Sequence, residues 1–161
     1  MSDDGSIAVS LSVRLGRIEV RVRNTSAGEL WFPGVVDGSE TASRYPHYLP
    51  SIRFVPTGDV VAEPPPAEDP LTGPLRPTDF QRLAPGEEFD PAAPGRFLPL
   101  STFANHRPSR RGIYRYILTI DTTGEDPATW VGTFGHQAYA GEVLPLLAKV
   151  PRVRTTATLD S

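Results

Sequence analysis

The longest run of β-branched and aromatic residues in the chain is RGIYRYILTID, which spans Arg111–Asp121. Residues of these types favour the extended backbone of a β-strand. A glycine stands near the head of the run, and the turn sequence TGEDP follows at residues 123–127. We therefore predict a central strand here, and we expect Thr129–Phe134 to be its antiparallel partner across the turn.

At the start of the chain, apolar residues alternate with polar ones over Ile7–Leu15 and again over Ile18–Arg23. A period of two is typical of a strand with one buried face. The dipeptide Gly16-Arg17 suits a two-residue hairpin loop with glycine first. The register predicted from that loop pairs Leu15 with Ile18, Val13 with Val20 and Leu11 with Val22. All three pairs are apolar, so the turn chemistry and the hydrophobic pattern agree.

Further short strands are predicted between turns rich in glycine and proline. They are Leu30–Phe32, Ile52–Val55, Val60–Val61, Phe80–Leu83 and, as an edge strand, Val153–Leu159. We interpret Tyr45–Pro50 as an aromatic loop held by prolines. Ten of the 18 prolines fall in residues 63–100, and since proline cannot donate to a sheet ladder, we predict a long proline-rich loop over 63–79. One helix is expected, over Ala138–Val150, interrupted by Pro145.

Many short strands with almost no helix indicate an all-β protein, an antiparallel β-sandwich with at most one short helix. Two motifs stand out, LAPGE at Leu83–Glu87 and GIYRY at Gly112–Tyr116. Together they resemble the late-strand signature of bacterial immunoglobulin-like domains, including the intracellular proteinase-inhibitor type. The resemblance implies an immunoglobulin-like fold in which the hydroxyl of Tyr114 bonds to the backbone at the end of the sandwich. The side chains that it turns toward the core are Tyr116, Leu118 and Ile120.

The composition sets limits on the kind of protein this is. A length of 161 residues fits a single domain, 1–161, that is large enough to bury a core without cross-links. The chain has no cysteine, which excludes disulfides, thiolate metal sites and a cysteine nucleophile. A net charge of -3 offers no field to attract a phosphate backbone, so we expect no nucleic-acid partner.

The N-terminus and the hydropathy pattern bear on the compartment. Residues 1–5 are small and acidic, unlike a secretory signal, and we predict a flexible N-terminus there. No apolar stretch approaches the length needed to cross a bilayer. We therefore expect a cytoplasmic protein without a membrane partner.

No motif for catalysis stands out. The three histidines, His47, His106 and His136, lie far apart, and none has metal-ligand spacing with another ligand type. The chain has no Gly-x-Ser-x-Gly elbow for a serine nucleophile. The carboxylates of Glu87, Glu88 and Asp90 lie in or next to a proline-glycine turn, where a solvated loop is the simpler interpretation. We therefore predict no enzyme activity, no cofactor and no metal.

Two groups of residues are candidates for binding a partner. The candidates are the basic group His106, Arg107, Arg110 and Arg111 and the aromatic group Tyr45, His47 and Tyr48. A basic loop can receive a carboxylate, a phosphate or an acidic partner, and amphipathic aromatics are common at protein interfaces and sugar platforms. The alternatives are a solvated flank for the basic group and a segment packed over the end of the core for the aromatic group.

The absence of catalytic motifs, together with these two groups, favours a non-catalytic protein-binding module. Such a module would act through its end loops, for example as an inhibitor or immunity-type partner of an intracellular enzyme. The second hypothesis is a carbohydrate-binding module, which would need Trp31 and Trp130 exposed on one sheet face. An enzyme is the third, and it would need two histidines and a carboxylate in one cleft. The edge strand Val153–Leu159 is capped either by its own chain or by a second copy in a homodimer.

Overall fold

The computed structural model of the chain describes residues 5–66, 71–135 and 137–161. Three features discussed above therefore lie outside the described residues in whole or in part. They are the predicted flexible N-terminus up to residue 4, residues 67–70 of the proline-rich loop, and His136. No helix within the described residues is long and apolar enough to cross a bilayer.

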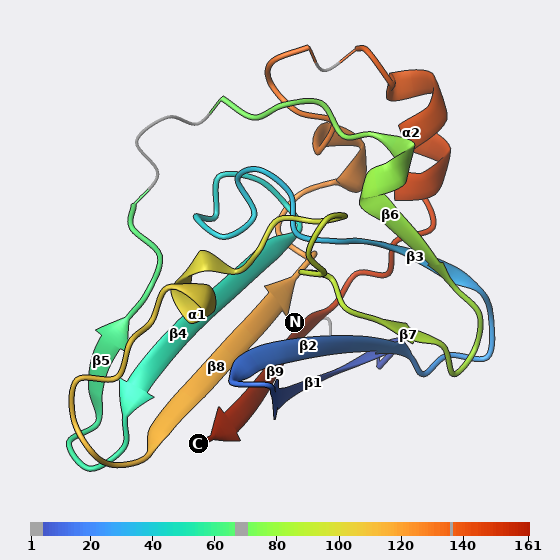
Figure 1. Cartoon of the computed structure of the whole chain (residues 1–161). Helices are drawn as coiled ribbons and strands as arrows, with labels where there is room; N and C mark the ends of the chain where they lie inside the picture. The colour runs from blue at the N-terminus through green and yellow to red at the C-terminus, as the bar shows by residue number, and fades with distance from the viewer. Residues whose placement is uncertain (1–4, 67–70, 136) are drawn as a thin grey trace.

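The described part of the chain consists mostly of antiparallel strands (Figure 1). The strands are β1 (Ile7–Arg14), β2 (Arg17–Asn24), β3 (Leu30–Pro33), β4 (His47–Phe54), β5 (Asp59–Ala62), β6 (Phe80–Leu83), β7 (Glu88–Phe89), β8 (Tyr114–Asp121) and β9 (Arg154–Asp160). The helical segments are η1 (Pro77–Asp79), α1 (Ser101–Ala104), η2 (Pro127–Thr129) and α2 (Ala140–Leu147). The sheets have the orders β1-β2-β7, β3-β6 and β5-β4-β8-β9.

The prediction of one helix at most is wrong, because α1 is a second short helix. Its first turn is held from outside: the carboxylate of Glu40 accepts hydrogen bonds from the backbone N–H groups of Ser101 and Thr102, at 2.9 and 2.8 Å. This carboxylate comes from a distant loop, so local sequence gave no sign of it. The predicted helix near the C-terminus is confirmed in its central part as α2. The predicted interruption at Pro145 is wrong, because Pro145 lies inside the continuous helix Ala140–Leu147.

The stretch that suggested a central strand forms β8, which lies between β4 and β9 in the four-stranded sheet. The prediction that Thr129–Phe134 pairs with this strand is wrong. That segment follows the 3-10 turn η2, which Pro127 begins and which the Asp126 carboxylate caps by accepting from the Ala128 N–H at 3.0 Å. The fixed φ angle of a proline suits the first position of a helical turn, and an acidic residue caps that turn. Together they outweigh the strand propensity of the residues that follow.

The N-terminal hairpin forms, but its predicted register is wrong by two residues. The observed pairs are Val13 with Ile18, Leu11 with Val20 and Val9 with Val22. Leu15 and Gly16, rather than Gly16 and Arg17, make the turn, with φ angles of 51° and 74°. Positive φ at both central residues is the pattern of a type I′ turn, which like the expected glycine-first loop matches the twist of a hairpin. A slip of two residues keeps the same side chains on the buried face, and it leaves Leu15 almost wholly exposed.

Strand β4 corrects the interpretation of Tyr45–Pro50 as a loop. The strand begins at His47, and from Tyr48 onward every second side chain is buried up to Phe54. Pro50 fits because β5 pairs only with Ile52–Phe54, so that Pro50 lies beyond the β5 ladder. The other predicted strands are confirmed to within a few residues as β3, β5, β6 and β9.

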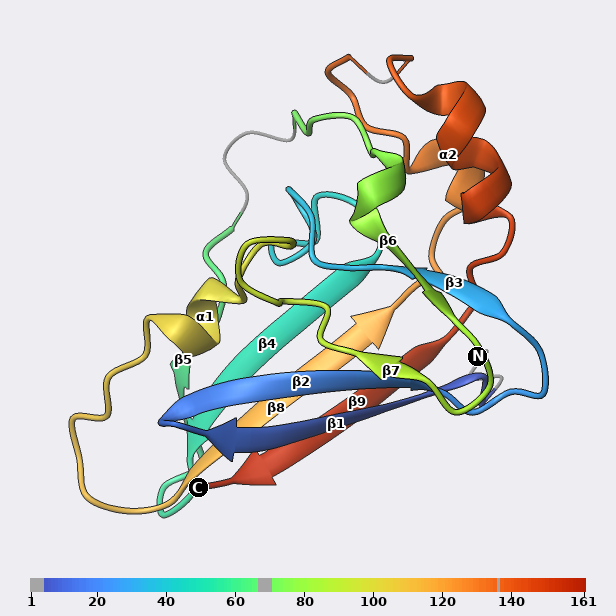
Figure 2. The same cartoon turned by 45° about the vertical axis from the view of Figure 1, so that its right-hand side comes forward.

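The sheets pack as layers around one core. Figures 1 and 2 show the β1-β2-β7 sheet crossing over the β8-β9 side of the larger sheet, with α2 and the β3-β6 pair toward one end and α1 toward the other. The largest fully buried side chains include residues from all three sheets and from α2, and they belong to a single cluster. Examples are Val20, Val22, Phe32, Tyr48, Phe80, Leu118, Ile120 and Leu147.

Tyr114 makes the backbone contact expected for it. Its hydroxyl donates to the carbonyl oxygen of Arg110 at 2.9 Å and accepts from the Arg110 N–H at 3.1 Å. The ring is buried and packs against Phe54, with ring centroids 5.0 Å apart. Leu118 and Ile120 are fully buried on the same face of β8, whereas Tyr116 is only half-buried. The partial exposure of Tyr116 marks the place where the core opens to solvent.

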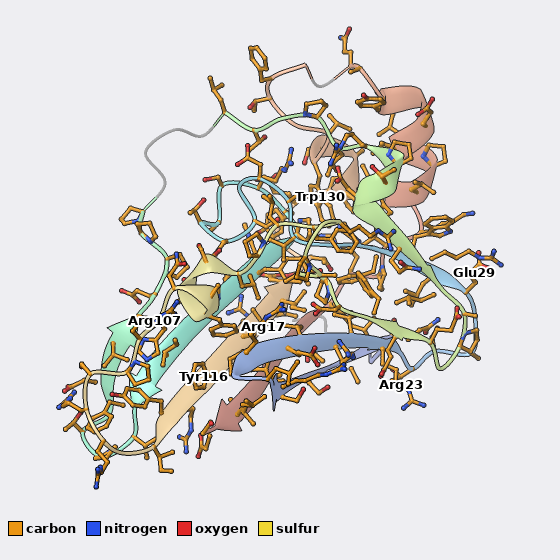
Figure 3. The ribbon with its side chains drawn as sticks, in the orientation of Figure 1. Arg17, Arg23, Glu29, Arg107, Tyr116 and Trp130 are labelled. Atoms are coloured by element: carbon orange, nitrogen blue, oxygen red, sulfur yellow. The ribbon has the colours of Figure 1, made fainter. Side chains whose placement is uncertain are left out.

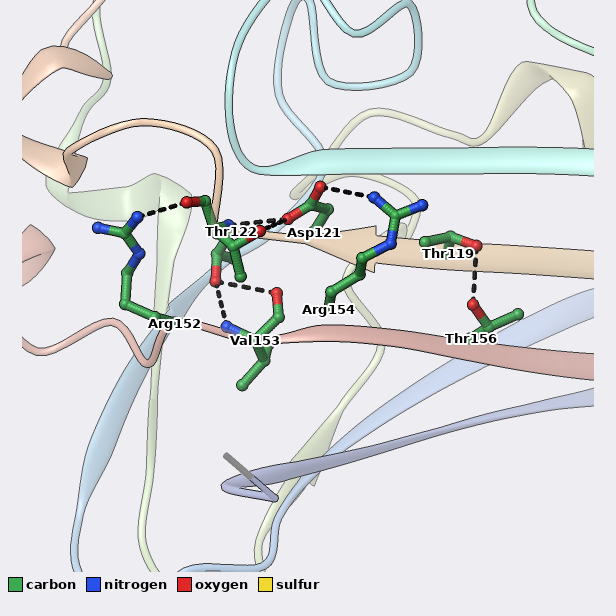
Figure 4. A network of polar contacts seen from close by, with 8 residues as sticks. Thr119, Asp121, Thr122, Arg152, Val153, Arg154 and Thr156 are labelled. Carbon is green, nitrogen blue, oxygen red and sulfur yellow. Dashed lines mark hydrogen bonds and ion pairs between the residues drawn. The ribbon is translucent and has the colours of Figure 1, made fainter. Parts of the chain in front are cut away.

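A polar network ties the end of β8 to the start of β9 (Figure 4). One carboxylate oxygen of Asp121 accepts from the backbone N–H and the hydroxyl of Thr123, at 2.8 and 2.6 Å. The other accepts from the Arg154 guanidinium at 3.0 Å. Burial alone would raise the pKa of Asp121, but the Thr123 hydrogen bonds and the Arg154 charge lower it from its ordinary value.

This lowered pKa predicts a stability that depends on pH. A carboxyl group whose pKa is lower in the folded state stabilises the protein above its unfolded pKa, near 3.9, and that contribution is lost as the pH falls through the folded value. Asp121→Asn should therefore lower the free energy of unfolding most at neutral pH, and by progressively less below about pH 4. Urea unfolding of both proteins at several pH values measures this. Glu63→Gln, at an exposed loop residue, is the control. A cost for Asp121→Asn that stays constant with pH would contradict the prediction.

Candidate functional site

A pocket of about 430 Å³ lies between the turn end of the β1-β2 hairpin and the segment that contains α1. We call it the interlayer pocket, because its walls come from both β2 and β8. Its apolar wall includes Val13, Ile18, Val20, Phe103 and Tyr116, and its polar lining includes Arg17, Asp90, His106 and Arg107. A pocket of a few hundred cubic ångströms that combines an apolar wall with convergent polar groups has the form of a binding site.

The apolar wall follows from the fold. Val20 is buried at the centre of the hairpin, whereas Val13 near its tip is 48% exposed. The hairpin therefore extends past the point where its apolar face is covered by the core. Phe103 of α1 closes the opposite side, with its ring edge-on to Tyr116 at 5.8 Å between centroids. The pocket is the unfilled end of the space between the layers.

Two arginines lie at this pocket without a carboxylate partner among the described residues. Arg107 donates from one guanidinium nitrogen to the carbonyl oxygens of Ala104 and His106, both at 2.9 Å. Arg17 is exposed and takes part in no ion pair of the described chain. Figure 3 shows Arg17, Arg107 and Tyr116 in the same region, beside the hairpin tip and α1. Arg17 and the remaining N–H groups of Arg107 can therefore bind an acidic group from outside.

His106 lines the interlayer pocket with an aromatic ring that is mainly uncharged. It lies edge-on to Tyr114 and Tyr116, with centroid distances of 5.3 and 6.2 Å. Burial, and to a lesser degree the charge of Arg107, lowers the pKa of His106. Its Nε2 atom is buried and has no hydrogen-bond partner among the described residues. A neutral imidazole at this position supplies an aromatic wall with one unused polar atom.

The predicted basic group therefore divides. His106 and Arg107 line the interlayer pocket, whereas Arg110 and Arg111 do not. Arg110 lies over the ring of Phe54, 4.0 Å from its centroid, and is 3.9 Å from the carboxylate of Asp59. Arg111 is exposed. The surroundings of Arg110 fit the alternative interpretation better, a solvated surface group whose charge balances that of a nearby acidic residue.

Asp90 is the carboxyl group of the pocket. Burial raises its pKa, although the backbone N–H of Ala92 and the charges of Arg21 and, to a lesser degree, Arg17 act in the opposite direction. The Arg21 guanidinium lies 3.8 Å from its carboxylate. Nowhere in residues 5–66, 71–135 and 137–161 do three or more histidine, aspartate or glutamate side chains come together as metal ligands would. Of the three carboxylates weighed as an acid/base group, Asp90 alone lines this pocket.

The aromatic group is largely internal. Tyr48 is fully buried, and its hydroxyl donates to the carbonyl oxygen of Pro33 at 2.6 Å. His47 is 8% exposed, and burial lowers its pKa. Tyr45 stacks on Trp130 with ring centroids 5.7 Å apart. Neither Tyr48 nor His47 offers a surface to a partner, so packing over the end of the core is the interpretation that the structure supports.

The platform required for carbohydrate binding does not form. Trp130 is 2% exposed, and Trp31 is half-buried. A sugar platform needs ring faces open to solvent, so the hypothesis that both tryptophans share one exposed face is wrong. Trp130 instead belongs to the core beneath Tyr45.

Most residues that line the interlayer pocket are not predicted from the sequence as site residues. Arg17, Tyr116 and Phe103 are the ones on which the site most depends. The sequence places Arg17 in a hairpin loop and Tyr116 in the core, and it predicts no element around Phe103. The exposed apolar residues at the tip of the hairpin are the signal in the sequence that points to this end of the molecule. Comparisons of the chain with protein-family models, with curated proteins and with solved structures found no match.

Proposed function

We propose that the chain is an immunoglobulin-like β-sandwich that acts as a non-catalytic module for binding another protein. The interlayer pocket would receive an apolar side chain from a partner segment, and Arg17 and Arg107 would bind acidic residues beside it. The partner class we favour is a cytoplasmic enzyme that the module inhibits or neutralises. The proposal rests on one observation, a pocket with an apolar wall and two arginines that form no ion pair with a carboxylate of the described chain.

Two features support the immunoglobulin-like part of the proposal. Tyr114 bonds its hydroxyl to the backbone of Arg110, as the tyrosine of a corner does in such domains. The β1-β2-β7 and β5-β4-β8-β9 sheets contribute alternate side chains to one core. Two facing antiparallel sheets of this kind are the architecture of a sandwich.

The chemistry of the pocket suits a protein segment. Burying one large apolar side chain contributes about 1.5–3 kcal/mol, and a guanidinium group binds a carboxylate through two parallel hydrogen bonds. Arginine and aromatic residues are also the types that dominate the energy of protein interfaces. Arg17 comes from the hairpin and Arg107 from the segment after α1, so an acidic ligand would contact both sides of the opening at once.

A displayed library of random peptides tests the proposal without knowledge of the natural partner. We expect selection on the wild-type protein to enrich peptides with a large apolar residue flanked by aspartate or glutamate. A synthetic copy of the strongest peptide should then bind at least about tenfold more weakly to the double variant Arg17→Glu/Arg107→Glu. Fluorescence polarisation of the labelled peptide measures the dissociation constants.

The matched control is Arg23→Glu/Arg53→Glu, which makes the same change of charge at two exposed residues that do not line the pocket. Arg23 lies at the other end of the hairpin from Arg17 (Figure 3). The control should bind the peptide as the wild type does. Enrichment of no peptide, or equal binding by both double variants, would overturn the proposal. Equal thermal midpoints would show that both variants are folded.

A further inference from the structure

A second pocket, of about 500 Å³, lies where three loops meet. The loops are the one that follows β3, the one that precedes η1 and the one that follows β7. It shares no lining residue with the interlayer pocket. Its charged lining residues are Asp37, Arg44, Arg76, Asp79 and Arg96. We call it the arginine pocket.

Arg44 is the unusual member of this pocket. The residue is only 9% exposed, yet no carboxylate of the described chain makes an ion pair with it. One guanidinium nitrogen donates to the carbonyl oxygen of Gly73, and Nε is buried without a partner. Burial lowers the pKa of Arg44, against the opposing charges of Asp37 and Asp79. A buried cation whose donors are unused costs free energy unless an anion completes its surroundings.

The Arg44 guanidinium group occupies space that is available because residue 132 is a glycine. Gly132 adopts a φ of +110°, and a Cβ there would lie 2.4 Å from the carbonyl oxygen of Gly73 and 3.1 Å from the Arg44 guanidinium. Any other residue at 132 would therefore displace both the guanidinium group and its acceptor. The position of Arg44 is imposed by its neighbours and is not that of a mobile surface side chain.

The other two arginines differ in what they bind. Arg76 is paired with the buried Asp79, whose carboxylate accepts from the Arg76 guanidinium at 3.1 Å and from its backbone N–H at 2.8 Å. Arg96 has no acidic partner in the described chain. It donates to Gln81 and to the carbonyl oxygen of Phe80, and its guanidinium carbon is 4.7 Å from the ring centroid of Phe97.

The charges of the pocket therefore favour an anion. Three arginines face two aspartates, and after Arg76 and Asp79 are paired, Arg44 and Arg96 remain against Asp37 alone. Arg96 is held in place by two neutral acceptors, so its charge is oriented and not neutralised. Oriented guanidinium groups at a partly enclosed site are the usual way in which proteins bind oxyanions.

We propose that the arginine pocket binds an oxyanion group, a phosphate or a carboxylate carried by a small molecule, between Arg44 and Arg96. Both arginines supply fixed N–H donors, and the Phe97 ring forms an apolar wall for the rest of the ligand. This site is independent of the protein-binding role proposed above.

Inorganic phosphate and succinate are suitable probes, and sodium chloride at equal ionic strength is the reference. We expect saturable changes in the backbone amide NMR signals of Gly73, Gly95 and Arg96 with at least one probe, together with a higher thermal midpoint. A response to phosphate alone would assign a phosphoryl ligand, and a response to succinate alone a carboxylate. No saturable binding of either probe below about 10 mM would overturn the proposal.

Variants separate binding from folding. Arg96→Gln removes an exposed charge, and Arg44→Lys keeps the buried charge but loses the planar donor fork. Both should bind the responsive probe at least about tenfold more weakly, whereas Arg53→Gln, outside the pocket, should bind it as the wild type does. Unchanged binding by Arg96→Gln would contradict the assignment even if Arg44→Lys failed to fold.

Discussion

Leu118→Ala is expected to lower the free energy of unfolding by about 2–5 kcal/mol, the largest effect we predict for a single truncation. Leu118 is fully buried in β8, where its neighbours on the adjacent strands are Pro50 and Ala157. Its side chain belongs to the core cluster, and a packed core relaxes only in part into the space that a truncation leaves. Such a loss is a large part of the about 5–15 kcal/mol by which a domain of this kind is stable.

Urea unfolding followed by circular dichroism measures the effect of Leu118→Ala. The matched control is Leu144→Ala, because Leu144 is 42% exposed on α2. Surface truncations usually change the free energy of unfolding by about 0.5 kcal/mol or less. Equal losses for the two variants would mean that β8 is not at the centre of the core.

Asn24→Ala is expected to lower the free energy of unfolding by about 2–4 kcal/mol. The Asn24 side chain connects the end of β2 to the turn that follows it and to β6. Its amide nitrogen donates to the carbonyl oxygens of Gly28 and Leu83, at 2.8 and 2.9 Å. Its amide oxygen accepts from the backbone N–H and the hydroxyl of Ser26, at 2.8 and 2.7 Å. The residue is completely buried, so alanine would leave the carbonyl of Leu83 without this donor and out of reach of water.

The control for Asn24→Ala is Asn105→Ala, at an exposed asparagine after α1. This control should leave the urea midpoint nearly unchanged, whereas Asn24→Ala should lower it with little change in the slope of the transition. Amide hydrogen exchange adds a local test, because the turn after β2 and the strand β6 should both lose protection. A loss confined to the turn would show that the bond to Leu83 contributes little.

Period-two patterns predicted the faces of the strands well. The hairpin shows why: a slip of two residues leaves Val20 and Val22 buried and changes only which residues face one another. The register depended on the turn, where Leu15 takes a positive φ that is uncommon for a residue with a branched side chain. Leu15 is almost wholly exposed, so the burial of its side chain does not explain that turn.

Strand boundaries were less predictable where prolines occur. Pro46 and Pro50 suggested a loop, yet His47–Phe54 is one strand. A proline is tolerated in a strand where no neighbouring strand needs its N–H, and that condition depends on where β5 ends. No local pattern in the sequence contains this information.

The candidate sites depended still more on tertiary structure. Arg17 of the hairpin lines the interlayer pocket together with Arg107 and Tyr116, and Arg44 lines the arginine pocket together with Arg96. Arg17 is about 90 residues from Arg107 in the sequence, Arg44 is about 50 from Arg96, and neither pair belongs to a shared motif. Of the seven residues predicted to bind a partner, His106 and Arg107 alone line the interlayer pocket.

The amino-acid sequence by itself determined that the chain forms antiparallel sheets, that β8 is central and which side chains of the hairpin face inward. These properties follow from side-chain alternation and from β-branched and aromatic residue types, which act over a few neighbouring residues. The tertiary structure alone decided the partners of β8 and the positions of both pockets. Each of these depends on contacts between residues distant in sequence, whose free energies are set by packing and burial rather than by local conformation.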